Sequence, residues 1–115
     1  MFINFTNHAS RLWGKKQRKA AEVYGDIFDI PFPAVSPAAP EEDIERTADE
    51  YAGRIITLKP DCVLCQGEFN LCYAVTKRLL EKGIKTVAAC SERKSVEKDG
   101  KKVSIFEFTG FRDYR

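Results

Sequence analysis

The sequence has a single histidine, His8, and none of the patterns that mark the common catalytic sites. It has no GxGxxG and no GxxxxGK[ST], which argues against a dinucleotide or nucleoside-triphosphate site of the usual kind. No Ser/His/Asp or Cys/His pattern is present, so covalent nucleophilic catalysis has little support. The several convergent carboxylates of a metal nuclease are also missing, and we expect neither a metal nor a cofactor.

The chain also lacks a strong net charge and any long apolar run. Its 19 basic and 17 acidic residues leave a net charge of +2, which does not indicate a duplex nucleic-acid partner. A basic block over residues 11–19 and an acidic block over residues 41–50 are typical of solvated helix faces. No stretch approaches the ~20 apolar residues of a membrane span, and the first residues lack the basic leader of a signal peptide. We expect a cytoplasmic protein that binds no membrane.

The four cysteines form no complete metal site. Cys62 and Cys65 have CxxC spacing, but they enclose an apolar run that reads as a strand. Residues three apart on a strand point to opposite faces, so the two sulfurs should diverge. No second CxxC or histidine cluster completes a zinc site. We therefore expect buried free thiols, which suit a reducing compartment.

The sequence does contain enough apolar residues, 43% of 115, for one domain over residues 1–115. A proline-rich loop is predicted over residues 31–40, and Asp99-Gly100 signals a hairpin turn. Strands are predicted at 2–6, 26–30, 62–65 and 85–90, and helices at 15–24, 41–58 and 69–82. This alternation predicts an α/β fold: a three-layer, Rossmann-like, mainly parallel sheet with a C-terminal β-hairpin.

Polar residues follow three of the four predicted parallel strands. In such sheets ligands bind beyond the carboxyl ends of the strands, so these residues should form one site. Helix N-termini and Arg93 would attract an anion, and Gly67 would let the backbone approach it closely, which points to a nucleotide. The candidate ligand-binding residues are Thr6, Asn7, His8, Ser10, Gln66, Gly67, Glu68, Phe69, Asn70, Ser91, Glu92 and Arg93.

With metal and covalent chemistry disfavoured, the remaining reaction is metal-independent cleavage of an RNA-like phosphodiester by its own 2′-hydroxyl. Positioning and electrostatics suffice for it. The candidate catalytic residues are His8 as general acid, Glu68, and Arg93 at the phosphate. Each has a structural alternative. His8 could cap the sheet edge, Glu68 could stabilise a helix N-terminus, and Ser91-Glu92-Arg93 could continue the strand into the hairpin.

Short segments at these positions also resemble a known family. They are Ile3-Asn4-Phe5-Thr6-Asn7-His8, then Trp13 and Gln17, then Gln66-Gly67-Glu68-Phe69 and Cys90-Ser91-Glu92-Arg93. With them the chain resembles small CRISPR-associated proteins with a CARF-like Rossmann core, in particular the minimal stand-alone ring nucleases of type III systems. The resemblance covers most of the chain, although each motif is short.

The resemblance implies a specific activity. Ring nucleases bind a cyclic oligoadenylate, usually cyclic tetra-adenylate, across a symmetric homodimer and linearise it without a metal, which ends an antiviral signal. A two-fold dimer suits a ring-shaped ligand of matching symmetry. Two alternatives stay open: a non-catalytic sensor or sponge for the same messenger, and an interaction subunit without a nucleotide ligand.

Overall fold

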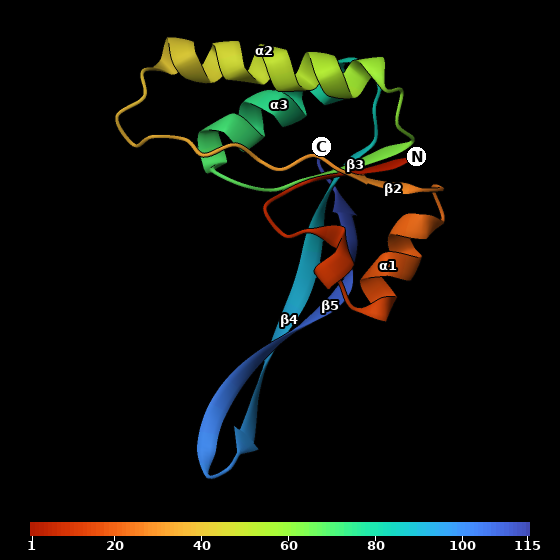
Figure 1. Ribbon diagram of the computed structural model, residues 1–115, viewed down its shortest axis with the longest axis vertical. Coiled ribbons are helices and arrows are strands. Elements are labelled where there is room, and N and C mark those ends of the chain that lie inside the picture. The colour runs from red at the N-terminus through yellow and green to blue at the C-terminus, as the bar shows by residue number, and fades with distance from the viewer.

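Five strands form one sheet in the computed structural model, which describes residues 1–115 (Figure 1). The order is β2-β1-β3-β4-β5, with β1 (Phe2–Phe5), β2 (Ile27–Asp29), β3 (Cys62–Cys65), β4 (Thr86–Lys98) and β5 (Lys101–Asp113). The first four strands are parallel, and β5 runs antiparallel to β4. Every residue of the central strands β1 and β3 is buried, which explains their nearly continuous apolar sequence.

Three helices cover the two faces of the sheet. α1 (Lys15–Glu22) lies on one face, and α2 (Glu41–Thr57) and α3 (Phe69–Glu81) pack together on the other (Figure 1). The alternation of β1 separates two cores: Phe2 packs in a cluster with Trp13, and Ile3 packs in a larger cluster with α2 and α3. This arrangement confirms the predicted α/β fold with a mainly parallel sheet and is consistent with a Rossmann-like fold.

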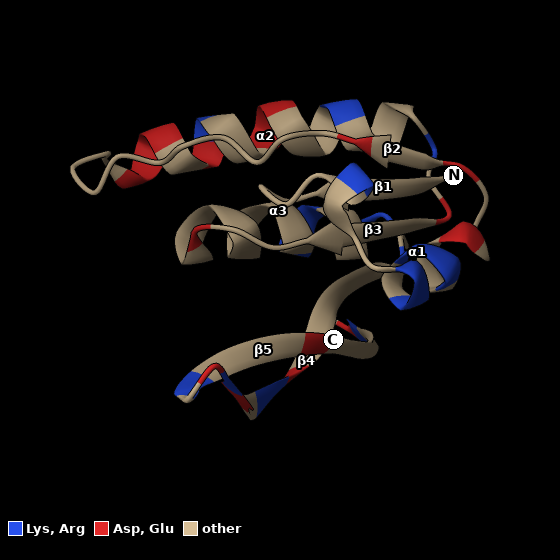
Figure 2. Cartoon of the chain, turned by 60° about the horizontal axis from the view of Figure 1, so that its bottom comes forward, with Lys and Arg blue, Asp and Glu red and all other residues tan.

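Several local predictions are confirmed by the element boundaries. α2 begins directly after Pro40, with three acidic residues in its first turn. Cys62 and Cys65 fall in different clusters, so their sulfurs lie on opposite faces of the sheet, and all four cysteines are free thiols. Figure 2 shows acidic residues spread along α2 and basic residues gathered on α1. No helix combines the length and apolar composition needed to cross a bilayer.

The C-terminal hairpin is longer than its sequence indicates. β4 was expected to end at Cys90, but it continues to Lys98. The predicted turn is confirmed, because Asp99 and Gly100 have φ values of 55° and 75°, which an Asp-Gly hairpin turn requires. A β-bulge between Cys90 and Ser91 marks the start of a ribbon, residues 91–108, whose strands pair only with each other. Figure 1 shows this ribbon extending away from the rest of the chain.

Candidate functional site

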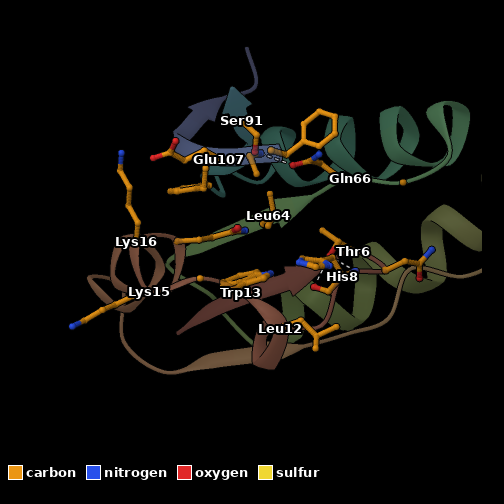
Figure 3. A pocket seen from close by; sticks show the side chains of 17 residues that line it. Thr6, His8, Leu12, Trp13, Lys15, Lys16, Leu64, Gln66, Ser91 and Glu107 are labelled. Carbon is orange, nitrogen blue, oxygen red and sulfur yellow. Dashed lines mark hydrogen bonds between the residues drawn. The ribbon is translucent and has the colours of Figure 1, made fainter. Parts of the chain in front are cut away.

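A cavity of about 850 Å³ opens at the carboxyl ends of β1 and β3 (Figure 3). The chain passes from β1 to β2 on one side and then crosses back to β3 on the other, so the strand order reverses between β1 and β3. In open parallel sheets this reversal leaves the crevice in which ligands bind. The cavity is lined by residues 6–8, residues 12–17, residues 66–67 and the ribbon, together with Leu64 of β3 and Ala89 of β4.

A buried asparagine, Asn4, fixes the loop that follows β1. Its side-chain nitrogen donates to the main-chain oxygen of His8 at 2.9 Å and to Asp29 Oδ1 at 3.1 Å. Its Oδ1 accepts a hydrogen bond of 2.8 Å from the Thr6 hydroxyl. Asp29 Oδ2 in turn accepts from the main-chain N–H and the hydroxyl of Ser10, both at 3.1 Å. Because each group of this network has a partner, the backbone at residues 6–10 is well defined.

His8 presents a free imidazole to the cavity. The residue is exposed, and its ring makes no hydrogen bond or ion pair within the chain. Its main chain is held instead, since its N–H donates to Thr6 Oγ1 at 3.1 Å. A neutral imidazole offers one donor and one acceptor nitrogen, so His8 can bind a ligand or transfer a proton without losing another contact.

The loop after β3 contributes an amide and a glycine. The main-chain N–H of Ala89 donates to Gln66 Oε1, which leaves the N–H groups of the Gln66 side chain free for an acceptor in the cavity. Gly67 has a packing role that the sequence did not indicate. A Cβ at this position would lie 2.5 Å from ring atoms of Phe32, so a larger residue would force the buried ring to move.

The first turn of α1 supplies positive charge. Gly14 is the N-cap and offers no side-chain hydrogen bond, and no acidic residue lies in the first turn. Lys15 and Lys16 occupy that turn and line the cavity; Figure 3 shows Lys16 extending on the Glu107 side and Lys15 pointing away. Free N–H groups at a helix N-terminus, together with ammonium groups, favour an anion such as a phosphate.

Aromatic and apolar side chains complete the walls of the cavity. Trp13 and Leu64 lie on the sheet side, and Trp13 is only 8% exposed with an indole N–H that has no partner. The ribbon contributes Phe106, which is 71% exposed, and Phe108. The exposed ring of Phe106 is suited to stacking against a nucleobase.

Half of the predicted ligand-binding residues are brought together by the fold. Of the twelve, the six that line the cavity are Thr6, Asn7, His8, Gln66, Gly67 and Ser91. Ser10 lies just behind this group, bonded to Asp29. Glu68, Phe69 and Asn70 line a separate cavity of about 730 Å³ between α3 and the proline-rich loop. Glu92 lies on the exposed ribbon, outside the cavity lining.

Two of the three predicted catalytic residues make structural contacts elsewhere. The Glu68 carboxylate caps α3, accepting from the main-chain N–H groups of Asn70 and Leu71 at 2.9 Å each. The Arg93 guanidinium donates to Ser104 Oγ at 3.0 and 3.1 Å across the ribbon. Of the three, only His8 lines the cavity. A catalytic role for Glu68 or Arg93 stays a prediction, because neither side chain lies at the cavity.

The chain was compared with known proteins in three ways. A family model described as "Uncharacterized protein MJ1673 family" matches residues 1–112. No curated protein matches the chain, and no solved structure does. Because the family match covers nearly the whole sequence, the chain belongs to this family.

Proposed function

We propose that this member of the MJ1673 family binds a cyclic oligoadenylate, with cyclic tetra-adenylate as the first candidate, and opens it without a metal. The observation that carries the proposal is one cavity that combines the free imidazole of His8, Lys16 at a helix N-terminus and an exposed aromatic wall at Phe106. The layered parallel sheet suits the CARF-like core that the sequence resemblance implies. The resemblance supplies the identity of the ligand; the cavity supports its chemical class.

Each part of such a ligand has a counterpart in the cavity. The phosphates would lie against Lys16 and the first turn of α1, where both the ammonium group and the free N–H groups favour negative charge. An adenine ring would stack on Phe106 of the ribbon, whose side chain is exposed. The free amide N–H groups of Gln66 would donate to a ring nitrogen or a phosphate oxygen.

The proposed reaction needs only a proton donor and correct placement of the reacting atoms. The 2′-hydroxyl attacks the adjacent phosphorus, a 2′,3′-cyclic phosphate forms, and the bond from phosphorus to the 5′-oxygen breaks. The 2′-oxygen loses its proton to solvent, the 5′-oxygen gains a proton from His8, and His8 then recovers one from solvent, so no water is consumed. His8 would protonate the leaving 5′-oxygen, since imidazole is the side chain most often used for general acid–base catalysis.

The size of the cavity favours two copies acting together. About 850 Å³ lies within the range of roughly 300–1,000 Å³ that encloses one drug-sized molecule, so one chain encloses part of a four-nucleotide ring. A symmetric homodimer would present the same residues twice and match the two-fold symmetry of the ring.

The test is incubation of the protein with labelled cyclic tetra-adenylate in the presence of EDTA. Linear products ending in a 2′,3′-cyclic phosphate support the proposal. Tight binding with an intact ring after long incubation at excess protein removes the nuclease and leaves the sensor or sponge. A ligand at a free concentration of 100 times its dissociation constant adds ~2.7 kcal/mol to the stability of the protein. Absence of a thermal shift with cyclic oligoadenylates of any ring size therefore leaves the interaction subunit.

Variants separate binding from chemistry. His8→Ala should slow cleavage by about 10²–10⁴-fold with little change in affinity, the usual contribution of a general acid. Lys15→Ala combined with Lys16→Ala should instead weaken binding by ~10-fold or more, because charged contacts contribute about 1.5–3 kcal/mol each. Lys98→Ala combined with Lys101→Ala removes the same charge from the tip of the ribbon. This control should leave binding unchanged, and an equal loss of affinity would contradict the assigned phosphate site.

A further inference from the structure

Two cysteine sulfurs lie close together outside the cavity. Cys65 ends β3, Cys72 lies in the first turn of α3, and their Sγ atoms are 3.8 Å apart. Cys65 is fully buried, whereas Cys72 is partly exposed. Cys62 belongs to the cluster on the opposite face of the sheet. The fold therefore selects one pair of thiols from the four.

The surroundings hold this pair in position. The Cys72 thiol donates to the main-chain oxygen of Cys65 at 3.4 Å, and the Tyr114 hydroxyl donates to the same oxygen at 2.8 Å. The Tyr114 hydroxyl also lies 3.7 Å from Cys72 Sγ. Tyr114 follows β5, so a residue that is distant in sequence holds the two neighbouring segments, the end of β3 and the start of α3, at the two sulfurs.

The pKa values of the two thiols are shifted in opposite directions. A hydrogen bond from Cys65 to the Cys72 sulfur lowers the pKa of Cys72 and outweighs the opposing effect of burial. The same bond, together with burial, raises the pKa of Cys65. A thiolate is the reactive form of cysteine, and positions near helix N-termini favour it. Cys72 is therefore the more reactive member, with Cys65 beside it as a second thiol.

We propose that Cys65 and Cys72 are a redox-modification site. A peroxide oxidises the two thiols to a reversible disulfide within one chain. The Sγ atoms must approach by about 1.7 Å to reach the S–S bond length of ~2.05 Å. The pair needs no change of fold for this, because both sulfurs already face each other between the end of β3 and the start of α3.

The chemistry balances in two steps. The Cys72 thiolate attacks one peroxide oxygen, the O–O bond breaks, and the released hydroxide takes up a proton to form water. The resulting sulfenic acid is attacked by Cys65, the S–O bond breaks, and the thiol proton leaves with the hydroxyl group as a second water. The two cysteines lose two electrons in total, and the peroxide gains both.

Oxidation would act on the neighbouring cavity through the chain between the two cysteines. The disulfide would close residues 65–72, a segment that includes Gln66 and Gly67 of the cavity wall. This consequence for a ligand rests on the proposed function. Formation of the disulfide does not rest on the proposed function, so it is tested without ligand. If no disulfide forms, the proposal for the cavity is unaffected.

The test treats the native protein with hydrogen peroxide and then counts free thiols and maps peptides without reduction. Two of the four thiols should be lost, a Cys65–Cys72 link should appear within single chains, and dithiothreitol should restore both thiols. Cys72→Ser should abolish the link, whereas Cys90→Ser, which changes a partly exposed thiol elsewhere, should retain it. Circular dichroism of each variant checks that it folds, and Cys65→Ser is a second variant at the pair.

Four thiols that survive peroxide treatment would overturn the proposal. A disulfide that joins other cysteines, or an equal loss of thiols to a disulfide in Cys72→Ser, would also overturn it. Oxidation that dithiothreitol cannot reverse would do the same. Links between chains through Cys90 would likewise contradict it, because the proposed site pairs thiols within one chain.

Discussion

The substitution Gly67→Ala is expected to destabilise this protein because of a contact with Phe32. The new Cβ would lie 2.5–2.6 Å from three ring atoms of Phe32. That ring is 4% exposed and packs against the ring of Phe5 at a centroid distance of 4.8 Å. The Phe5 ring is itself stacked on Tyr51 at 5.3 Å. Three aromatic rings therefore resist the movement that would make room for a methyl group.

The size of the effect follows from this geometry. Carbon atoms pack best at about 3.5–4.0 Å, so the contact is too short by roughly 1 Å. Overpacking of a core costs about 1–3 kcal/mol, whereas replacing glycine stabilises by about 0.4–1 kcal/mol through the unfolded state. The net loss should be about 1–2 kcal/mol, which lowers Tm by ~4–8 °C in a domain of this size.

The assay is thermal and urea unfolding followed by circular dichroism, with Gly53→Ala as the matched control. Gly53 lies within α2, and a Cβ there meets nothing within 4 Å. The same substitution should therefore stabilise the protein at this position, by about 0.5–1 kcal/mol. In a Phe32→Leu background the clash is relieved, and Gly67→Ala should cost measurably less than in the wild type.

Two results would refute this reasoning. Gly67→Ala could be as stable as the wild type, or its cost could be the same in the Phe32→Leu background. A fully stable Gly67→Ala protein that no longer binds cyclic tetra-adenylate would instead assign the glycine to close approach of a ligand.

Three further predictions concern stability. Asn4→Ala should lower the free energy of unfolding in urea by about 1–3 kcal/mol, because its side chain is 1% exposed and its hydrogen-bond partners would be left unpaired. The control Asn70→Ala, on the surface, should leave stability unchanged. Glu68→Ala should cost about 0.5–2 kcal/mol and speed amide exchange at the start of α3, and unchanged exchange would contradict its capping role. Burial raises the pKa of Cys62 from its ordinary 9.0 to about 11, so the unfolded thiol ionises first and stability should fall between those pH values. Cys62→Ala should lose less stability than the wild type over that range, and an equal loss in both proteins would count against the assignment.

The regular elements were predictable because each leaves a local signature. β3 is buried on both sides and reads as an apolar run, Pro40 marks where α2 begins, and Asp99-Gly100 marks the turn. The extension of β4 was not predictable in this way. Residues 91–98 are exposed on both faces, so no alternation of apolar and polar residues distinguishes them from a loop.

The position of the candidate site was predictable from topology, but its full composition was not. Polar residues after β1 and β3 meet because parallel strands end at the same side of a sheet. The lysines of α1 and Phe106 of the ribbon join them only because α1 packs beside β5, a contact that no local pattern encodes. Glu68 shows a second limit, since a carboxylate before a helix can serve as a cap or as an acid. Its side-chain direction decides between the two.

Along the single strand β4, protection from solvent changes from nearly complete to absent. Thr86 and Val87 are each 1% exposed, whereas every residue from Ser91 to Lys98 is exposed. Local opening free energies follow such gradients, so amide hydrogens of the ribbon should exchange quickly while those of β3 exchange only on global unfolding. A ligand that binds only the folded chain would slow exchange in β3 in proportion to the stability it adds. A ligand that also covers the cavity wall at Phe106 would slow exchange in the ribbon as well. Exchange in β3 therefore reports the gain in overall stability, whereas exchange in the ribbon reports whether a molecule covers this wall of the cavity.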